Sequence, residues 1–210
     1  MSVKTKQTSY MKKLLPLFLL ALVSFRTPDA TITADERKAA LEQLKLSRDQ
    51  FTKATRGLSE AQMNYKASPD SWSVAEVAEH IAVSESAIWS MLEGAMKQPA
   101  DPSRRGEVKV DDAGILAGVS SRERKVKTSE ALTPANKFGS AEGSIREFMT
   151  KRESHMAFVK DTQEDLRNRY AQTPFGVVDA YQVILFMSGH TTRHVKQMEE
   201  VIANASFPKK

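Results

Sequence analysis

Residues 183–201 read Val-Ile-Leu-Phe-Met-Ser-Gly-His-Thr-Thr-Arg-His-Val-Lys-Gln-Met-Glu-Glu-Val. One stripe in this stretch recurs in steps of four, three, four and seven residues, and it consists of Val183, Met187, His190, His194 and Val201. Steps of this size place the stripe on a single face of an α-helix. The spacing therefore predicts a helix from about residue 179 to residue 204, with both histidines on its buried face.

Three other segments repeat their apolar residues at helical spacing, over residues 33–55, 73–96 and 142–169. The second of these has the clearest start. Ser73 followed by Glu76 forms the Ser-x-x-Glu capping box, in which each side chain satisfies a backbone N–H of the first turn. Four helices are therefore expected.

Residues 97–140 separate the second helix from the third, and prolines and glycines interrupt any long periodicity there. Asp111 is expected to cap a short helix that runs through Val119. So long a connection is unusual in a compact domain, but two parallel helices need a crossover between them. Four helices, one long crossover and no strand signal predict an all-α fold, a four-helix bundle.

Residues 1–30 have the features of a secretory leader. Lys12 and Lys13 precede an apolar run of 12 residues from Leu14 to Phe25. A membrane span needs about 20 such residues, whereas a signal peptide has a shorter run after a basic start. We predict a leader over residues 1–30, an exported domain over residues 31–210, and no stable membrane span once the leader is removed. An uncleaved N-terminal anchor is the alternative.

Most of the net charge of +5 comes from this leader, which holds five basic residues and one acidic residue. The remaining 180 residues carry 26 basic and 25 acidic side chains. A nucleic-acid-binding domain usually has a concentrated basic patch, so we expect no nucleic-acid partner. The chain has no cysteine, which excludes disulfides, thiolate metal ligands and a cysteine nucleophile.

Three of the four histidines are candidate metal ligands. His190 and His194 are four residues apart, so they lie one above the other on a helix. His80, in Val-Ala-Glu-His-Ile-Ala, falls on the inward face of the second helix. Three imidazoles would leave coordination positions open, as catalytic metal sites do. The fourth histidine, His155, is expected at the surface or boundary of the third helix.

The order of these motifs resembles the DinB/YfiT-like family of metalloenzymes over roughly residues 34–204. The resemblance rests on Trp72-Ser73-Val74-Ala75-Glu76-Val77 with His80, and on His190-Thr-Thr-Arg-His194. It implies a crossover between the second and third helices of the bundle, and a divalent ion bound by His80, His190 and His194. Zinc is the favoured ion, with nickel or iron as alternatives. The implied chemistry is hydrolysis or thiol-dependent transfer on a small-molecule substrate.

The catalytic residues stay unassigned at this point. Glu79 is next to His80, but neighbours on a helix point about 100° apart, and we expect Glu79 to face water. Glu85 is about a turn away and is not assigned as a base either. The rival hypotheses are a non-catalytic helical module that binds a metal or a small molecule, and a scaffold without metal. A homodimer is compatible with such a bundle.

Overall fold

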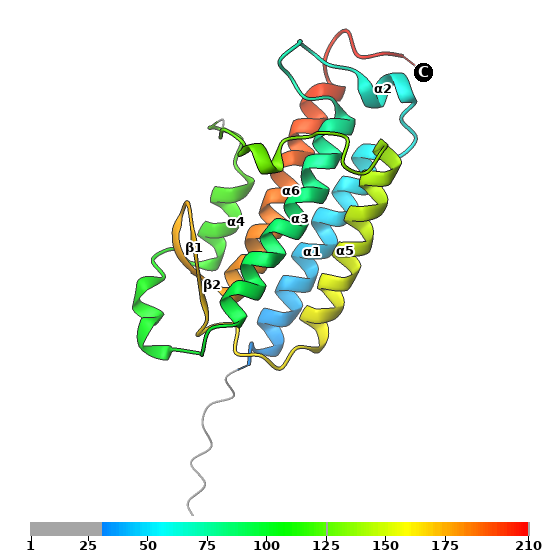
Figure 1. Ribbon diagram of the computed structural model, residues 1–210. Helices are drawn as coiled ribbons and strands as arrows, with labels where there is room; N and C mark the ends of the chain where they lie inside the picture. The colour runs from blue at the N-terminus through cyan, green and yellow to red at the C-terminus, as the bar shows by residue number, and fades with distance from the viewer. Residues whose placement is uncertain (1–30, 125, 210) are drawn as a thin grey trace, which may run out of the picture.

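The computed structural model describes residues 31–124 and 126–209. Four long helices lie side by side (Figure 1): α1 (Ala34–Thr55), α3 (Val74–Met96), α5 (Ala141–Asp161) and α6 (Ala180–Ile202). In the view of Figure 1, α1 and α6 rise while α3 and α5 descend. Because α3 and α5 run in the same direction, the chain must return along the bundle between them. The predicted four-helix bundle and its crossover are confirmed. The predicted leader, residues 1–30, lies outside the described residues.

Helix α3 begins at the capping box predicted from the sequence, and α1 and α6 begin at caps of the same kind. The Ser73 hydroxyl accepts a hydrogen bond from the Glu76 N–H, and the Glu76 carboxylate accepts one from the Ser73 N–H at 2.8 Å. Thr33 caps α1 in the same reciprocal way. Asp179 caps α6, where its carboxylate accepts from the Gln182 N–H at 2.7 Å. Each cap satisfies donors that the first helical turn leaves without a partner.

The crossover contains a short helix between two 3₁₀ turns: η1 (Pro102–Glu107), α4 (Asp112–Ser120) and η2 (Glu130–Leu132). Asp111 caps α4, as predicted. Figure 1 shows α4 lying along α6, after which the chain crosses the upper ends of α6 and α3 to reach α5. A side chain at Gly189 would place its Cβ only 3.1 Å from the Cβ of Val119. The missing side chain therefore lets α4 pack closely on α6.

The third helix is shorter than its apolar spacing indicated. It ends at Asp161 rather than near residue 169, and the chain then turns back on itself. Leu166 is fully buried, and its carbonyl oxygen accepts from the Tyr181 N–H. The Arg167 guanidinium bonds carboxylates of three other segments, those of Glu36, Asp112 and Asp179. Contacts with distant parts of the chain therefore outweigh the local helical pattern.

A small hairpin and a short helix were not predicted. β1 (Tyr170–Thr173) and β2 (Gly176–Asp179) form an antiparallel hairpin, so the expectation of no strand was wrong. Strands of four residues are too short for an alternating pattern to emerge, and Gly176 supplies the positive φ, 99°, in the turn. The other element, α2 (Glu60–Asn64), interrupts the connection predicted between α1 and α3.

The core consists of two apolar clusters stacked along the bundle. One surrounds Leu44, Leu92 and Ile184, and the other surrounds Phe51 and Met198. On each long helix, buried polar positions separate the residues of the two clusters: Ser47, Ser84, Glu85, Arg152, His155, Ser188 and Thr191. A polar layer therefore crosses the middle of the bundle. In the described part of the chain, no helix has both the length and the apolar character that a membrane span requires.

Candidate metal centre

The three predicted ligands come together between α3 and α6. His80 lies in the second turn of α3, and His190 and His194 follow one another on α6. Each offers a ring nitrogen that lies within 4.8 Å of those of the other two. His80 and His194 are buried, with 2% and 8% of their surface exposed, while His190 keeps partial access to water. Two distant segments of sequence therefore meet at one point. The helix spacing predicted the shared face of the α6 pair, and the family resemblance implied that His80 joins it.

The partners of two rings determine which nitrogen faces that point. The Nδ1 atom of His80 lies 2.8 Å from the carbonyl oxygen of Leu132, which can only accept, so this nitrogen carries the proton. The Nδ1 atom of His194 lies 2.9 Å from Oε1 of Gln197 and donates in the same way. Both Nε2 atoms are left with lone pairs, and they face each other at 3.1 Å.

This donor set fits a divalent metal ion. Two lone pairs turned toward each other at 3.1 Å repel unless a cation lies between them. Tetrahedral bonds of about 2.0–2.1 Å from zinc to histidine nitrogen put neighbouring nitrogens roughly 3.3 Å apart, close to the spacing seen here. The Leu132 and Gln197 oxygens are the outer partners that orient ligand rings in metal sites.

The surroundings keep all three imidazoles neutral. Burial lowers the pKa of His80, although its hydrogen bond to Leu132 opposes this effect. Burial, together with the neighbouring His80, lowers the pKa of His194 to about 3. Burial and the charges that His194 and His80 would carry hold the pKa of His190 well below its usual range. Neutral rings are the form that binds a metal ion.

Glu79 is buried, which contradicts the prediction that it faces water. Only 6% of its surface is exposed. Its carboxylate accepts hydrogen bonds from the backbone N–H groups of Ala135, Asn136 and Lys137, at 2.8, 2.9 and 2.8 Å. The prediction failed because the crossover covers this side of α3, and nothing in the helical spacing shows which face a distant loop will cover.

His155 also lies in the interior, although a surface or boundary position was expected. Its Nδ1 is 2.9 Å from Oε1 of Glu85, and its ring stacks on Trp89 with the centroids 3.9 Å apart. Arg152 binds both oxygens of Glu85, each at 2.8 Å. His155 is therefore a paired core histidine and is not part of the metal-ligand group.

These contacts decide the question of a general base. The Glu79 carboxylate is held by three backbone donors, and the Glu85 carboxylate by Arg152 and His155. Among the described residues, no carboxylate joins the three histidines. The side-chain hydroxyl of Ser84 lies beside the site, with its Oγ 3.5 Å from Nε2 of His80. The site can thus bind a cation, but it contains no free carboxylate to take up a proton.

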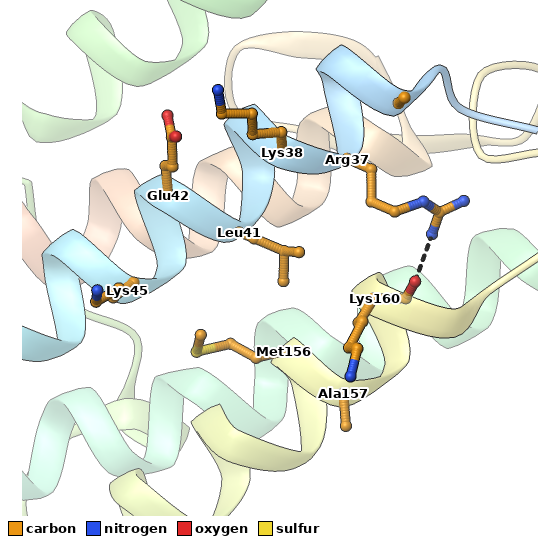
Figure 2. Close-up of a pocket in the computed structure, with 9 residues that line it drawn as sticks. Arg37, Lys38, Leu41, Glu42, Lys45, Met156, Ala157 and Lys160 are labelled. Atoms are coloured by element: carbon orange, nitrogen blue, oxygen red, sulfur yellow. Dashed lines mark hydrogen bonds between the residues drawn. The ribbon is translucent and has the colours of Figure 1, made fainter.

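A groove lies away from the histidines, between α1 and α5. Figure 2 shows Leu41 pointing from α1 toward α5, where Met156 lies, while Lys38 extends away from α5. Arg37 donates a hydrogen bond to the carbonyl oxygen of Lys160 across its end. Its lining has no histidine, hydroxyl or cysteine side chain, so it lacks the imidazole donors that come together between α3 and α6.

Comparison with known proteins agrees with this geometry. Residues 43–198, most of the described chain, match the sequence pattern of the DinB superfamily. The chain belongs to the DinB superfamily. All three histidines lie within the matched region.

Two proteins similar to this DinB-superfamily chain come from Bacillus subtilis, one in sequence and one in fold. The uncharacterized protein YuaE of strain 168 is 29% identical over 147 residues, which cover 70% of this chain and 86% of YuaE. The structure of YfiT, described as a probable metal-dependent hydrolase with an unusual four-helix bundle topology, is similar with a TM-score of 0.54. That match covers 87% of this chain and 94% of YfiT at 13% identity, so it establishes the shared fold.

Proposed function

We propose that this protein is an exported, divalent-metal-dependent hydrolase that acts on a small-molecule substrate, with His80, His190 and His194 as the metal ligands. The observation that carries the proposal is the pair of Nε2 atoms at 3.1 Å, each on a ring whose Nδ1 is taken by an oxygen acceptor. The description of YfiT as a probable metal-dependent hydrolase supports the same chemistry.

The side chains of this site would hold, orient and desolvate the ion. Three lowered pKa values keep the imidazoles unprotonated at neutral pH. Leu132 and Gln197 keep two of the rings from rotating. His80, His190 and His194 would hold the divalent ion as neutral ligands, and the bound ion would supply Lewis acidity, which lowers the pKa of a bound water molecule. An all-nitrogen ligand set suits zinc, with nickel or iron as alternatives.

Two observations bear on the rival functions. The absence of a free carboxylate among the described residues near the histidines favours a non-catalytic module that only binds a metal or a small molecule. Thiol transfer is the other chemistry that such a site permits, because a divalent ion also stabilises a thiolate. The leader sequence weighs against it, since low-molecular-weight thiols are mainly cytosolic.

Metal analysis of the purified protein tests the ligand assignment. We expect the wild-type protein to bind one equivalent of zinc and His190→Ala to lose it, because two nitrogens from α3 and α6 hold an ion far less tightly than three. Glu199→Ala is the matched control, as Glu199 is exposed on the same helix. Full metal occupancy in His190→Ala would rule out the assignment.

A substrate screen then separates the functions. We expect the zinc-loaded protein to cleave small ester, amide or phosphate substrates, and His190→Ala to be inactive. Loss of zinc that barely changes thermal stability would favour catalysis, because a structural ion adds to the folding free energy. Turnover only with added thiols would support transfer instead. The export proposal is tested separately, by cell fractionation and by the N-terminal mass of the mature protein.

A further inference from the structure

Two neighbouring residues of α3 form hydrogen bonds with the same part of the crossover. His80 donates through Nδ1 to the carbonyl oxygen of Leu132, and Glu79 accepts from three N–H groups a few residues further along. Figure 1 shows this segment passing over the upper end of α3 before α5 begins. The loop that orients a metal ligand is therefore anchored one residue away from that ligand.

The anchor is a concave array of backbone donors. Asn136 has a φ of 58°, in the left-handed region that few residues other than glycine adopt. This conformation turns the N–H groups of Ala135, Asn136 and Lys137 toward one carboxylate, an arrangement that binds anions. Charged acceptors make stronger hydrogen bonds than neutral ones, and Glu79 is buried. Lys137 also donates through Nζ to the carbonyl oxygen of Ala131 at 2.7 Å, which closes the segment on itself.

We propose that Glu79 is a positioning residue for the metal centre. By holding Ala135–Lys137, it places the Leu132 carbonyl against Nδ1 of His80 and so keeps the proton on that nitrogen. The lone pair of Nε2 then faces the ion. Without the Leu132 carbonyl as acceptor, the proton of His80 can move from Nδ1 to Nε2. Nε2 then has no lone pair with which to bind the ion. The claim that Glu79 affects metal affinity rests on the proposed function. The claim that Glu79 fixes the tautomer of His80 does not, because the tautomer can be measured in the metal-free protein.

Glu79→Gln is the sharpest test. The amide keeps the size of the side chain but loses its charge and one acceptor oxygen, and its NH₂ group opposes a backbone N–H. Glu93→Gln is the matched control, because Glu93 is exposed on the same helix and its bond from Trp89 survives in an amide. We would record the His80 tautomer in metal-free protein by ¹⁵N NMR, and the zinc affinity by competition with a chelator.

We expect Glu79→Gln to raise the fraction of His80 protonated at Nε2 and to weaken zinc binding by about 10–100-fold, as loss of an outer-shell partner usually does. Glu93→Gln should leave both values at those of the wild type. A wild-type tautomer and a wild-type affinity in Glu79→Gln would overturn the inference.

Two further measurements keep the test decisive. If Glu79→Gln does not fold, Glu79→Asp takes its place, since it keeps the charge but is one methylene shorter. A wild-type tautomer and a wild-type affinity in that variant would also refute the role of Glu79. If the wild-type protein binds no zinc, the proposed function fails, but the tautomer measurement still decides whether Glu79 positions His80.

Discussion

His80 and His194 each give one ring nitrogen to an oxygen acceptor and turn the other toward a shared point, whereas His155 lies in the core with different partners. Its Nδ1 faces the Glu85 carboxylate, and its ring is stacked on Trp89. The residue type is the same in all three cases. The difference lies in the partner of each nitrogen, which turns two of these histidines into candidate ligands and the third into a structural residue.

The neutral histidines predict that the metal-free protein loses stability in acid. The folded-state pKa of His194 is about 3, below the ordinary 6.5, so the unfolded chain binds more protons between these values. Stability is then fully present above pH 6.5 and falls as the pH drops toward 3. Between pH 7.5 and pH 5, one such histidine should lower the free energy of unfolding by roughly 2 kcal/mol. Urea unfolding of chelator-treated protein at the two pH values measures this loss.

The variant His194→Gln isolates the contribution of this ring. Glutamine does not titrate, so the stability difference between pH 7.5 and pH 5 should shrink by roughly 2 kcal/mol relative to the wild type. An unchanged difference would show that His194 is not held neutral in the folded protein.

At the scale of single elements, the start of α5 is shaped by its contact with the crossover. A Cβ atom at Gly143 would lie 2.2 Å from the carbonyl oxygen of Phe138, well inside any permitted contact. Gly94, near the end of α3, has no atom within 4 Å of the corresponding position. The two glycines therefore differ in surroundings, although both lie in helices.

This difference predicts opposite effects of the same substitution. Gly143→Ala should destabilise the protein by about 1–3 kcal/mol, because backbone rather than a flexible side chain must move. Gly94→Ala should stabilise it by about 0.5–1 kcal/mol, since alanine loses less entropy than glycine when it enters a helix. Thermal or urea unfolding compares the two. Equal effects of the same sign would contradict the packing described here.

At the scale of the whole molecule, Arg152 connects all four long helices. From α5 its guanidinium reaches the Leu44 carbonyl and Ser47 on α1, Glu85 on α3 and Thr191 on α6. It is fully buried. Thr191 follows His190 directly, so this polar layer also fixes the part of α6 that carries the histidine pair.

The variant Arg152→Met should lower the free energy of unfolding by about 3–5 kcal/mol, because it leaves the buried Glu85 carboxylate without its main partner. Lys151→Met on the same helix, whose ion pair with Glu147 is partly exposed and 3.8 Å long, should change stability by less than about 0.5 kcal/mol. The double variant Glu85→Gln/Arg152→Met should recover part of the loss, because no charge then remains unpaired. A double variant no more stable than Arg152→Met would contradict this explanation.

The sequence predicted most accurately those structural features that depend on residues close together in the chain. The caps at Ser73 and Asp111 and the histidine spacing on α6 depend on residues within a few positions of one another. It failed for Glu79, whose three partners are in the crossover, and for the end of α5, where Arg167 finds carboxylates on other segments. Helical periodicity contains no information about such partners.

The amino-acid order was therefore enough to predict four long helices, their parallel crossover and the three residues that converge. The helices and the crossover follow from a 3.6-residue period, from end caps and from the length of the connection, whereas the set of three histidines rested also on the resemblance to the DinB/YfiT-like family. The direction of each imidazole, the burial of Glu79 and the polar layer around Arg152 were settled only when the helices and the crossover packed together. A hydrogen bond between remote segments exists only once folding has brought its two atoms within reach of each other.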